Sequence, residues 1–392
     1  MTDLKLMMVT PYFYPKMGGV EKYVYEICSR LVDHYSVEVS VVCTNWDAHD
    51  NTYREETLGG ISVYRLPYLL KVSSTPVHPG WTAMLRDLIR RIQPDVVNGH
   101  IPVPQIADGA VRAAHKEKVP YILTYHNDLT GYNPAVRALS RLYYLTEWNR
   151  TQELSRLIIA TSEYYAQTSP YLSPHLDKIR IVSPGVDIEK YRMLQTDHIR
   201  RTFGLGDEKI ILFVGQLNRE SQHKGLEDLI TAISHVNRSF DARLVVVGKG
   251  DYLEHYRRHA EREGVDKYVI FAGYVADEEI VHYFCGSDVM VLPSYNRAEG
   301  FGMVLIEAQA CGTPVIGTTM GGIRAAVRDH ETGLLVPPRE PKKIAGAIQE
   351  ILQDSSCSEQ MGLSGYRWVR EKFSWQKSTS DFFSVACEGA GR

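Results

Sequence analysis

The chain has 392 residues, of which 44% are hydrophobic and 23% are charged, and its formal net charge is −3. This length predicts two domains, because a single hydrophobic core rarely grows beyond about 250–300 residues. The composition is ordinary for a globular protein, and the small net charge gives no electrostatic basis for a nucleic-acid partner.

The six cysteines are scattered and include no C-x-x-C pair, which is typical of small buried side chains in a reducing compartment. The N-terminal apolar run is too short for a signal peptide. No uninterrupted run of about 18 apolar residues predicts a transmembrane helix. We therefore expect a cytoplasmic protein, or one that lies on the inner face of a membrane without entering it.

Short apolar strands alternate with helical patterns in the first half, as in doubly wound α/β layers. Between the strands, helices are expected that include 20–34 and 81–91. Strands are predicted near 4–10, 37–44, 61–66, 96–98, 121–125, 157–161 and 179–182.

Two features of this half could contact a ligand. Gly18 and Gly19 follow the first strand and open the first helix, and their N–H groups could reach a phosphate or an acceptor. The alternative is a purely structural turn in which Glu21 complements the helix dipole. His126 follows the strand at 121–125, and ligands bind beyond the carboxyl ends of such strands, although a lone histidine is more often structural.

The segment Pro134–Arg150 predicts a helix that carries Arg137, Arg141 and Arg150 among several aromatic residues. Basic and aromatic side chains together suit an anionic membrane surface, so peripheral membrane contact is a hypothesis. The alternative is a helix whose Tyr and Trp side chains pack into the core.

A second series of strands is predicted at 209–214, 243–248, 269–271, 289–292 and 314–317, which gives a second Rossmann-like half. The loop after its first strand carries Arg219 and Lys224, whose charge suits phosphate, although both could be solvated loop cations. Gly248 closes the next strand, and Tyr274 and Val275 follow the third.

The most informative stretch is Glu299-Gly-Phe-Gly-Met-Val-Leu-Ile-Glu307, which follows a predicted buried strand. The two glycines open a helical pattern, so Glu299 should lie on the loop and Glu307 roughly two turns into the helix. The free N–H groups between the two carboxylates suit a diphosphate. A nucleotide sugar, with phosphates in the middle and hydroxyl-bearing sugars at both ends, fits this arrangement.

This stretch resembles the E-x7-E signature of the GT4-type retaining glycosyltransferases, also called glycosyl transferases group 1, which have the GT-B fold. The resemblance includes Gly18-Gly19-Val-Glu21, Thr124–Asp128, Lys224-Gly225 and the linker Pro184–Tyr191, and spans nearly the whole chain. It implies an α/β protein with two Rossmann-like domains that face each other across a cleft. We expect an acceptor-binding domain of residues 1–186, joined by a crossover helix at 373–392, and a nucleotide-sugar-binding domain of residues 187–372.

The resemblance also implies roles for single residues. Glu299 would contact the donor sugar hydroxyls, Glu307 the ribose diol, and His126 the transferred sugar. Lys224 would hold the diphosphate together with Arg219, which we expect to replace an arginine that many members have at the position of Gln216. The implied catalytic residues are His126, Arg219, Lys224 and Glu299, and the implied donor-binding residues are Gly18, Gly19, Gly248, Tyr274, Val275, Gly300, Phe301, Gly302, Met303 and Glu307.

The implied activity is retaining transfer of a hexose from a UDP- or GDP-sugar to a glycan or lipid-linked acceptor in cell-envelope glycan or glycolipid biosynthesis. No Asp-x-Asp motif and no zinc-ligand spacing occurs in the sequence, so neither a metal nor another cofactor is expected. Two alternatives stay open. One is a nucleotide-sugar epimerase of the same fold, and the other is a non-catalytic nucleotide-sugar binding protein, which the glutamine at position 216 motivates.

Overall fold

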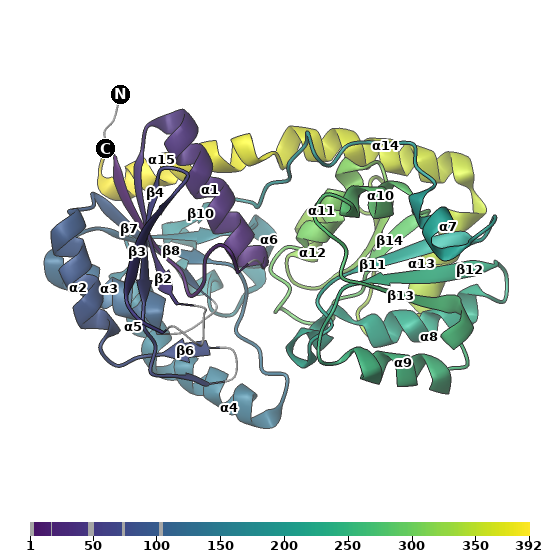
Figure 1. Cartoon of the computed structure of the whole chain (residues 1–392), viewed down its shortest axis with the longest axis horizontal. Helices are drawn as coiled ribbons and strands as arrows, with labels where there is room; N and C mark the ends of the chain where they lie inside the picture. Colours follow the sequence, from purple (N-terminus) through teal and green to yellow (C-terminus); the bar gives the residue numbers. More distant parts are fainter. Residues whose placement is uncertain (1–3, 17, 46–50, 73–74, 102–104) are drawn as a thin grey trace. The chain divides into compact units, whose positions relative to one another are not determined.

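The computed structural model describes residues 4–16, 18–45, 51–72, 75–101 and 105–392 (Figure 1). The chain divides into two compact units. The first comprises Met1–Gly185 and Trp375–Arg392, and the second comprises Val186–Ser374. The junction expected after residue 186 and the return expected at residue 373 lie within two residues of these boundaries.

The first unit is built on an eight-stranded sheet with the order β10-β9-β8-β7-β1-β2-β4-β3. All neighbouring pairs are parallel except β3 and β4. The strands are β1 (Lys5–Val9), β2 (Glu38–Thr44), β3 (Arg54–Leu58), β4 (Ile61–Leu66), β7 (Val96–Ile101), β8 (Tyr121–Tyr125), β9 (Leu157–Ala160) and β10 (Ile179–Ile181), with a separate hairpin of β5 (Leu70–Val72) and β6 (Thr75–Val77).

Two groups of helices in this unit pack together, α1 with α15 and α2 with α3, and the groups lie on opposite faces of the sheet (Figure 1). The helical elements are α1 (Gly19–Tyr35), α2 (Trp81–Ile92), α3 (Ile106–Glu117), α4 (Pro134–Tyr143), the π-helical turn η1 (Tyr144–Trp148), α5 (Asn149–Leu154), α6 (Glu163–Thr168), the 3₁₀ turn η2 (Ser173–Lys178) and α15 (Trp375–Ala390).

The second unit has a six-stranded sheet with the order β13-β12-β11-β14-β15-β16, and every pair is parallel. This is the strand order of a Rossmann fold. Its strands are β11 (Lys209–Val214), β12 (Ala242–Val247), β13 (Val269–Gly273), β14 (Val289–Leu292), β15 (Val315–Thr318) and β16 (Gly333–Val336). Its helices are α7 (His198–Phe203), η3 (Arg219–Lys224), α8 (Leu226–Val236), α9 (Leu253–Arg262), η4 (Asp266–Tyr268), α10 (Ile280–Cys285), α11 (Met303–Ala310), α12 (Ile323–Ala326), α13 (Pro341–Gln353) and α14 (Ser355–Lys372).

The predicted α/β architecture with two Rossmann-like units is confirmed, but the predicted strands were incomplete. β3, β16 and the β5–β6 hairpin were not predicted, and β3 is an exposed, charged edge strand without an apolar pattern. The strand expected near 96–98 is confirmed and continues to Ile101, since Asn98 and His100 are buried in it despite their polarity. The helix expected at 134–150 is confirmed and forms as α4, η1 and the start of α5.

Each sheet has one topological switch point, at which the connections from two neighbouring strands run to opposite sides of the sheet. In the first unit this point lies between β1 and β7, and in the second between β11 and β14. The loops that leave these strands at their carboxyl ends carry the predicted glycine turn of the first unit and both Lys224 and Glu299 of the second. The topology therefore gathers the glycine turn of the first unit, and Lys224 and Glu299 of the second, at the switch points.

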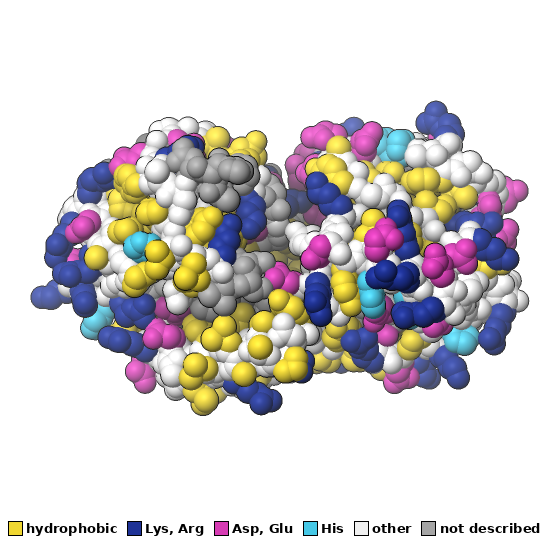
Figure 2. All heavy atoms as spheres, turned by 60° about the horizontal axis from the view of Figure 1, so that its bottom comes forward, with side chains coloured by type: hydrophobic (Ala, Val, Ile, Leu, Met, Phe, Trp, Pro, Cys, Tyr) yellow, Lys and Arg dark blue, Asp and Glu magenta, His cyan; other side chains and the backbone are white. Residues whose placement is uncertain are grey.

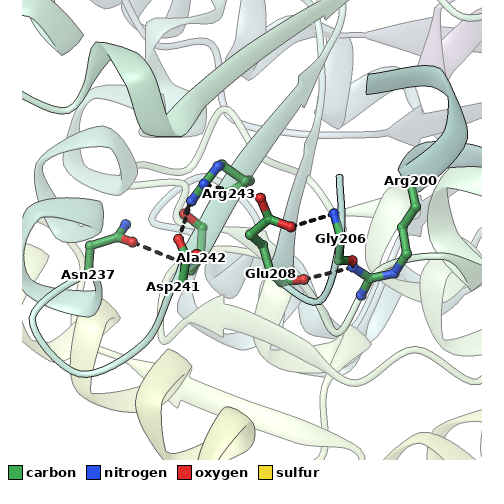
Figure 3. Close-up of polar contacts among 7 residues, drawn as sticks. All are labelled: Arg200, Gly206, Glu208, Asn237, Asp241, Ala242 and Arg243. Atoms are coloured by element: carbon green, nitrogen blue, oxygen red, sulfur yellow. Dashed lines mark hydrogen bonds and ion pairs between the residues drawn. The ribbon is translucent and has the colours of Figure 1, made fainter. Parts of the chain in front are cut away.

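The opposite, amino-terminal ends of β11 and β12 are joined by a network of polar contacts (Figure 3). Glu208 accepts a hydrogen bond of 2.6 Å from the Gly206 N–H, and its other carboxylate oxygen lies 3.2 Å from Arg243. Arg200 donates to the Glu208 carbonyl at 3.0 Å. The side chains of Arg243 and Glu208 are only 19% and 18% exposed, so the pair is partly shielded from water.

We expect Glu208→Ala to lower the free energy of unfolding by about 1–3 kcal/mol, because Arg243 and the Gly206 N–H lose a shared acceptor. The comparison is with Glu261→Ala, which removes an exposed carboxylate from α9. Unfolding in urea would measure the free energy of both variants, and equal unfolding midpoints would contradict the predicted loss.

Candidate active site

The core of the candidate site in the second unit is an ion pair between two loops. Lys224 Nζ lies 2.8 Å from Glu299 Oε2, and Ser294 Oγ donates to the same oxygen at 3.3 Å. Lys224 ends η3 after β11, whereas Glu299 belongs to the loop after β14. Gly225 fixes the approach of the two loops, because it has φ +75° and a Cβ there would lie 2.1 Å from the Pro293 carbonyl oxygen.

The electrostatics keep this pair charged. Burial raises the pKa of Glu299, but the charges of Lys224 and His223 and the hydrogen bonds from Lys224 and Ser294 outweigh it, so the pKa lies below its ordinary value. Burial and the neighbouring Lys224 lower the pKa of His223. Glu299 is therefore a carboxylate at neutral pH, and Lys224 is already paired with it before any phosphate arrives.

The helix that carries Glu307 begins later than the sequence suggested. Gly302 has φ +84° and forms the N-cap without a side-chain hydrogen bond, and α11 begins at Met303. Glu307 is thus the fifth residue of the helix, a little over one turn from its start, and the expectation of roughly two turns was wrong. Its side chain is 7% exposed. The first N–H groups of α11 have no capping side chain, which is the property that an anion site requires.

The glycine-rich stretch before α11 is held by a second glycine pair. A Cβ on Gly322 would lie 1.9 Å from the Gly300 carbonyl oxygen, and one on Gly321 would lie 2.6 Å from that of Glu299. The Gly322 N–H donates to the Glu299 carbonyl at 3.3 Å. Phe301 is buried at 3% exposure, so only its backbone is available to a ligand. The sequence analysis missed Gly321 and Gly322, although a Gly-Gly pair soon after a strand was a usable signal.

The loops after β11 and β12 also contact each other closely. Gly248 has φ +147°, and a Cβ there would lie 1.9 Å from the Gly215 carbonyl oxygen. The Arg219 N–H donates to Asp251 at 3.0 Å, while the Arg219 side chain is exposed and makes no ion pair within the described part of the chain. The structure thus gives Gly248 a packing role and leaves the Arg219 guanidinium available to a ligand.

Tyr274 and Val275 follow β13 directly. The Tyr274 ring is 67% exposed, and the Lys249 ammonium lies 4.5 Å above its centre. Val275 is partly buried against the core. Contact of their backbone with a nucleotide base stays a prediction.

In the first unit, Gly18 is the N-cap of α1 without a side-chain hydrogen bond, and Gly19 begins the helix. The Glu21 carboxylate folds back over this turn, since a Cβ on Gly18 would lie 2.6 Å from Glu21 Oε2. Burial raises the pKa of Glu21. The turn therefore carries its own acidic residue, Glu21, as the structural alternative for this motif expects.

His126 has a buried partner that the sequence analysis missed. His100 Nδ1 lies 3.0 Å from His126 Nε2, and Tyr23 contacts the His126 ring edge to face with 5.1 Å between the ring centres. His100 is the fifth residue of β7 and is fully buried, whereas His126 directly follows β8 and is 7% exposed. A histidine inside an otherwise apolar strand was the signal that could have revealed the pair.

The surroundings decide which nitrogen atoms of this pair carry protons. His100 Nε2 is buried without a hydrogen-bond partner among the described residues. A proton there would be an unpaired buried donor, so we assign the His100 proton to Nδ1, which then donates to His126 Nε2. His126 must then carry its own proton on Nδ1. Burial lowers the pKa of His126 to about 3 and that of His100 well below its ordinary value, so both rings are neutral at pH 7.

Comparison with known proteins places these sites in a family. The family model described as Glycosyltransferase Family 4 matches residues 17–190, and the one described as Glycosyl transferases group 1 matches residues 195–368. The chain belongs to the GT4-type glycosyltransferases. It is an enzyme of the transferase class, as its named relatives are.

Two relatives match over nearly the whole chain. A GDP-mannose-dependent alpha-(1-6)-phosphatidylinositol monomannoside mannosyltransferase of Mycobacterium tuberculosis is 29% identical over 388 residues, covering 95% of each chain. The D-rhamnosyltransferase WbpZ of Pseudomonas aeruginosa is 28% identical, covering 92% of this chain and 90% of its own.

Solved structures show that the glycosyltransferase has the GT-B fold. Sucrose-phosphate synthase from Thermosynechococcus elongatus superposes with a TM-score of 0.79 at 22% identity, covering 98% of both chains. Anabaena Alr3699/HepE in complex with UDP-glucose gives 0.78 at 18% identity, covering 98% of this chain and 100% of its own. Within the described residues of our protein, no helix is long and apolar enough to cross a membrane.

The buried histidine pair predicts a loss of stability in weak acid. Because their pKa values are lower in the folded state than in the unfolded state, the unfolded chain takes up protons first as the pH falls below about 6.5. Stability should therefore decrease between pH 7 and pH 5, and His100→Asn should make this decrease smaller. Thermal melts at both pH values would measure it. The exposed His115→Asn is the control, and an unchanged pH dependence in His100→Asn would refute the assignment.

Proposed function

We propose that this glycosyltransferase moves a hexose from a UDP- or GDP-sugar to a glycan or lipid-linked acceptor, with retention at the anomeric carbon and without a metal ion. The observation that carries the proposal is the Lys224–Glu299 ion pair at the β11/β14 switch point, in the loops beside the uncapped start of α11. Together these features offer a cation and backbone donors for a diphosphate, and a carboxylate for a sugar hydroxyl.

In this reaction the bond between the anomeric carbon and the diphosphate oxygen breaks, and a bond to the acceptor oxygen forms on the same face. The acceptor proton passes to the leaving diphosphate, so the enzyme needs no nucleophile of its own. Lys224, Arg219 and the α11 amides would stabilise the negative charge that grows on the diphosphate. Phosphate oxygens would compete with Glu299 for Lys224, which frees the carboxylate to accept hydrogen bonds from the donor sugar.

We assign the remaining contacts in the same proposal. Glu307 accepts from the ribose diol, the backbone at Tyr274 and Val275 contacts the base, and His126 holds the transferred sugar. With its proton on Nδ1, His126 would donate a hydrogen bond to a sugar oxygen. Since its pKa is about 3, the ring orients the sugar and does not act as a proton donor in acid–base catalysis.

The relatives support the choice of donor and acceptor. By their printed names, the mycobacterial relative uses GDP-mannose and a phosphatidylinositol monomannoside, and the Pseudomonas relative transfers D-rhamnose. A lipid-linked acceptor would place the reaction at a membrane surface, on its cytoplasmic face. The exposed side chains of Arg137, Arg141 and Arg150 support contact with an anionic surface.

The proposal is tested by ligand screening followed by product analysis. We expect one UDP- or GDP-sugar to raise the melting temperature, because a ligand that binds only the folded state stabilises it by mass action. Incubation of that donor with glycan and lipid-linked acceptors should give a product whose NMR spectrum shows the anomeric configuration of the donor, also in the presence of EDTA. An inverted product would refute retention. Release of nucleotide and an epimerised sugar without an acceptor would identify an epimerase, and binding without any turnover or donor hydrolysis would identify a binding protein.

Two variants should separate donor binding from chemistry. Glu307→Gln should weaken nucleotide affinity by about tenfold, since the ribose hydroxyls lose a charged acceptor. Lys224→Met should lower kcat by roughly 10²-fold or more, because its charge matters most as the diphosphate departs. Calorimetry and initial rates would be compared with the exposed Glu261→Gln and Arg258→Met. Unchanged nucleotide affinity in Glu307→Gln would contradict the ribose assignment.

A further inference from the structure

The first unit contains a pocket of about 590 Å³ whose lining includes none of the residues assigned to sugar transfer. It is bordered by the end of α4, by η1 and α5, by the segment that connects α6 to η2, and by the start of η2. The lining residues that matter here are Arg141, Tyr144, Leu145, Trp148 and Tyr171.

The inner wall of the pocket is aromatic. Trp148 and Tyr144 are 3% and 8% exposed, and their rings meet edge to face. Tyr171 stacks in parallel on Tyr144, so each of these two rings covers one face of the other. Asn149, Gln152 and His175 also line the pocket. A glycan usually stacks on an open aromatic face, and the rings of Tyr144 and Trp148 are too deeply buried to offer one. The aromatic wall therefore favours an apolar chain over a sugar.

Leu145 lines the pocket and belongs to a row of exposed leucines. Leu139, Leu142 and Leu145 are 52%, 55% and 76% exposed and follow one another at intervals of three residues along α4 and η1. Leu176, which follows the lining residues Pro174 and His175 on η2, is 49% exposed. Figure 2 shows hydrophobic side chains gathered over the lower edge of the first unit, where Figure 1 places α4. Such a cluster is unfavourable in water and marks a contact surface.

The same helix supplies positive charge beside the leucines. Arg137 and Arg141 are exposed and one helical turn apart, and no carboxylate in the described ranges forms an ion pair with either of them. Apolar side chains next to unpaired cations complement an amphiphile that has an acidic headgroup and a hydrocarbon chain.

We propose that this pocket binds an acyl chain of an anionic bilayer lipid, that Arg137 and Arg141 hold its phosphate headgroup, and that the surrounding leucines enter the membrane interface. The proposal extends the membrane contact proposed above to a defined lipid site. Lipid binding itself requires no sugar transfer, so the two proposals can fail separately.

The pocket is also connected to the His126 segment. The Tyr144 hydroxyl accepts from the Leu129 N–H at 2.7 Å and lies 3.0 Å from the Tyr125 hydroxyl. Tyr125 in turn donates to Asp128 at 2.8 Å. A lipid that packs against Tyr144 would thus steady the residues that immediately follow His126.

Vesicle flotation without nucleotide tests whether this surface binds an anionic membrane. We expect the full chain to float with phosphatidylcholine vesicles that contain phosphatidylglycerol, and to float poorly with phosphatidylcholine alone. Leu142→Glu/Leu145→Glu should abolish flotation, whereas Leu363→Glu, an exposed leucine of the second unit, should not. Arg137→Gln/Arg141→Gln should weaken binding by roughly 25-fold, about fivefold for each cation. No flotation of the unaltered chain, or equal flotation of all variants, would overturn the proposal.

Tryptophan fluorescence distinguishes lipid bound in the pocket from lipid that only touches the protein surface. Phosphatidylglycerol with brominated acyl chains should quench tryptophan emission, and Trp148→Phe should remove most of this quenching while the protein still floats. Trp46 and Trp368 are replaced by Phe in both proteins, and Trp81 and Trp375, which are buried elsewhere in the first unit at 2% and 0% exposure, should contribute little. Flotation with the same quenching in Trp148→Phe would mean that lipid touches the surface only, and the pocket assignment would be wrong.

Discussion

The contact between the loops after β11 and β14 is the constraint on which the proposed donor site depends. Gly225 allows its loop to pass beside the Pro293 carbonyl, which no larger residue could do without moving one of the two loops. This approach places Lys224 against Glu299, although 75 positions separate them in the chain. Burying a carboxylate is costly, and here the charges of Lys224 and His223 and the hydrogen bonds from Lys224 and Ser294 together outweigh the desolvation. The site is thus charged and fixed in shape before a donor arrives.

The first unit also contains a buried polar pair in a fixed geometry, but the groups of this pair are neutral. His100 has no other described partner on its outer nitrogen, so its one hydrogen bond fixes both its own tautomer and that of His126. Burial keeps both rings neutral. A fixed neutral histidine is a hydrogen-bond donor of defined direction, which suits the orientation of a sugar better than the transfer of a proton. The Lys224–Glu299 pair lies at the switch point of the second unit, and the His100–His126 pair joins β7 to the end of the neighbouring β8, so the sheet order assembles both buried pairs.

The lipid pocket illustrates how one segment can serve the core and the surface at once. Between residues 134 and 148 the aromatic side chains are buried and the leucines are exposed, which reverses the usual preference for aliphatic residues in the interior. The tyrosine hydroxyl groups can be buried because that of Tyr144 hydrogen-bonds to the Tyr125 hydroxyl and to the backbone beyond β8, and that of Tyr143 donates to Asp108. The sequence alone left two interpretations of this segment, aromatic packing or membrane contact. The structure shows that the aromatic side chains pack into the core. It also shows that leucine and arginine side chains of the same segment are exposed, which supports membrane contact.

The sequence by itself determined the α/β class, most strand positions, the family and the glycine turns, because each of these depends on patterns within a short stretch of chain. The alternation of strands and helices and the spacing from Glu299 to Glu307 are of this kind. Only the tertiary structure decided that Lys224 pairs with Glu299, that His100 supports His126, and that α11 begins at Met303. These features depend on which strands become neighbours and on a single backbone angle at Gly302, and neither is encoded in local periodicity.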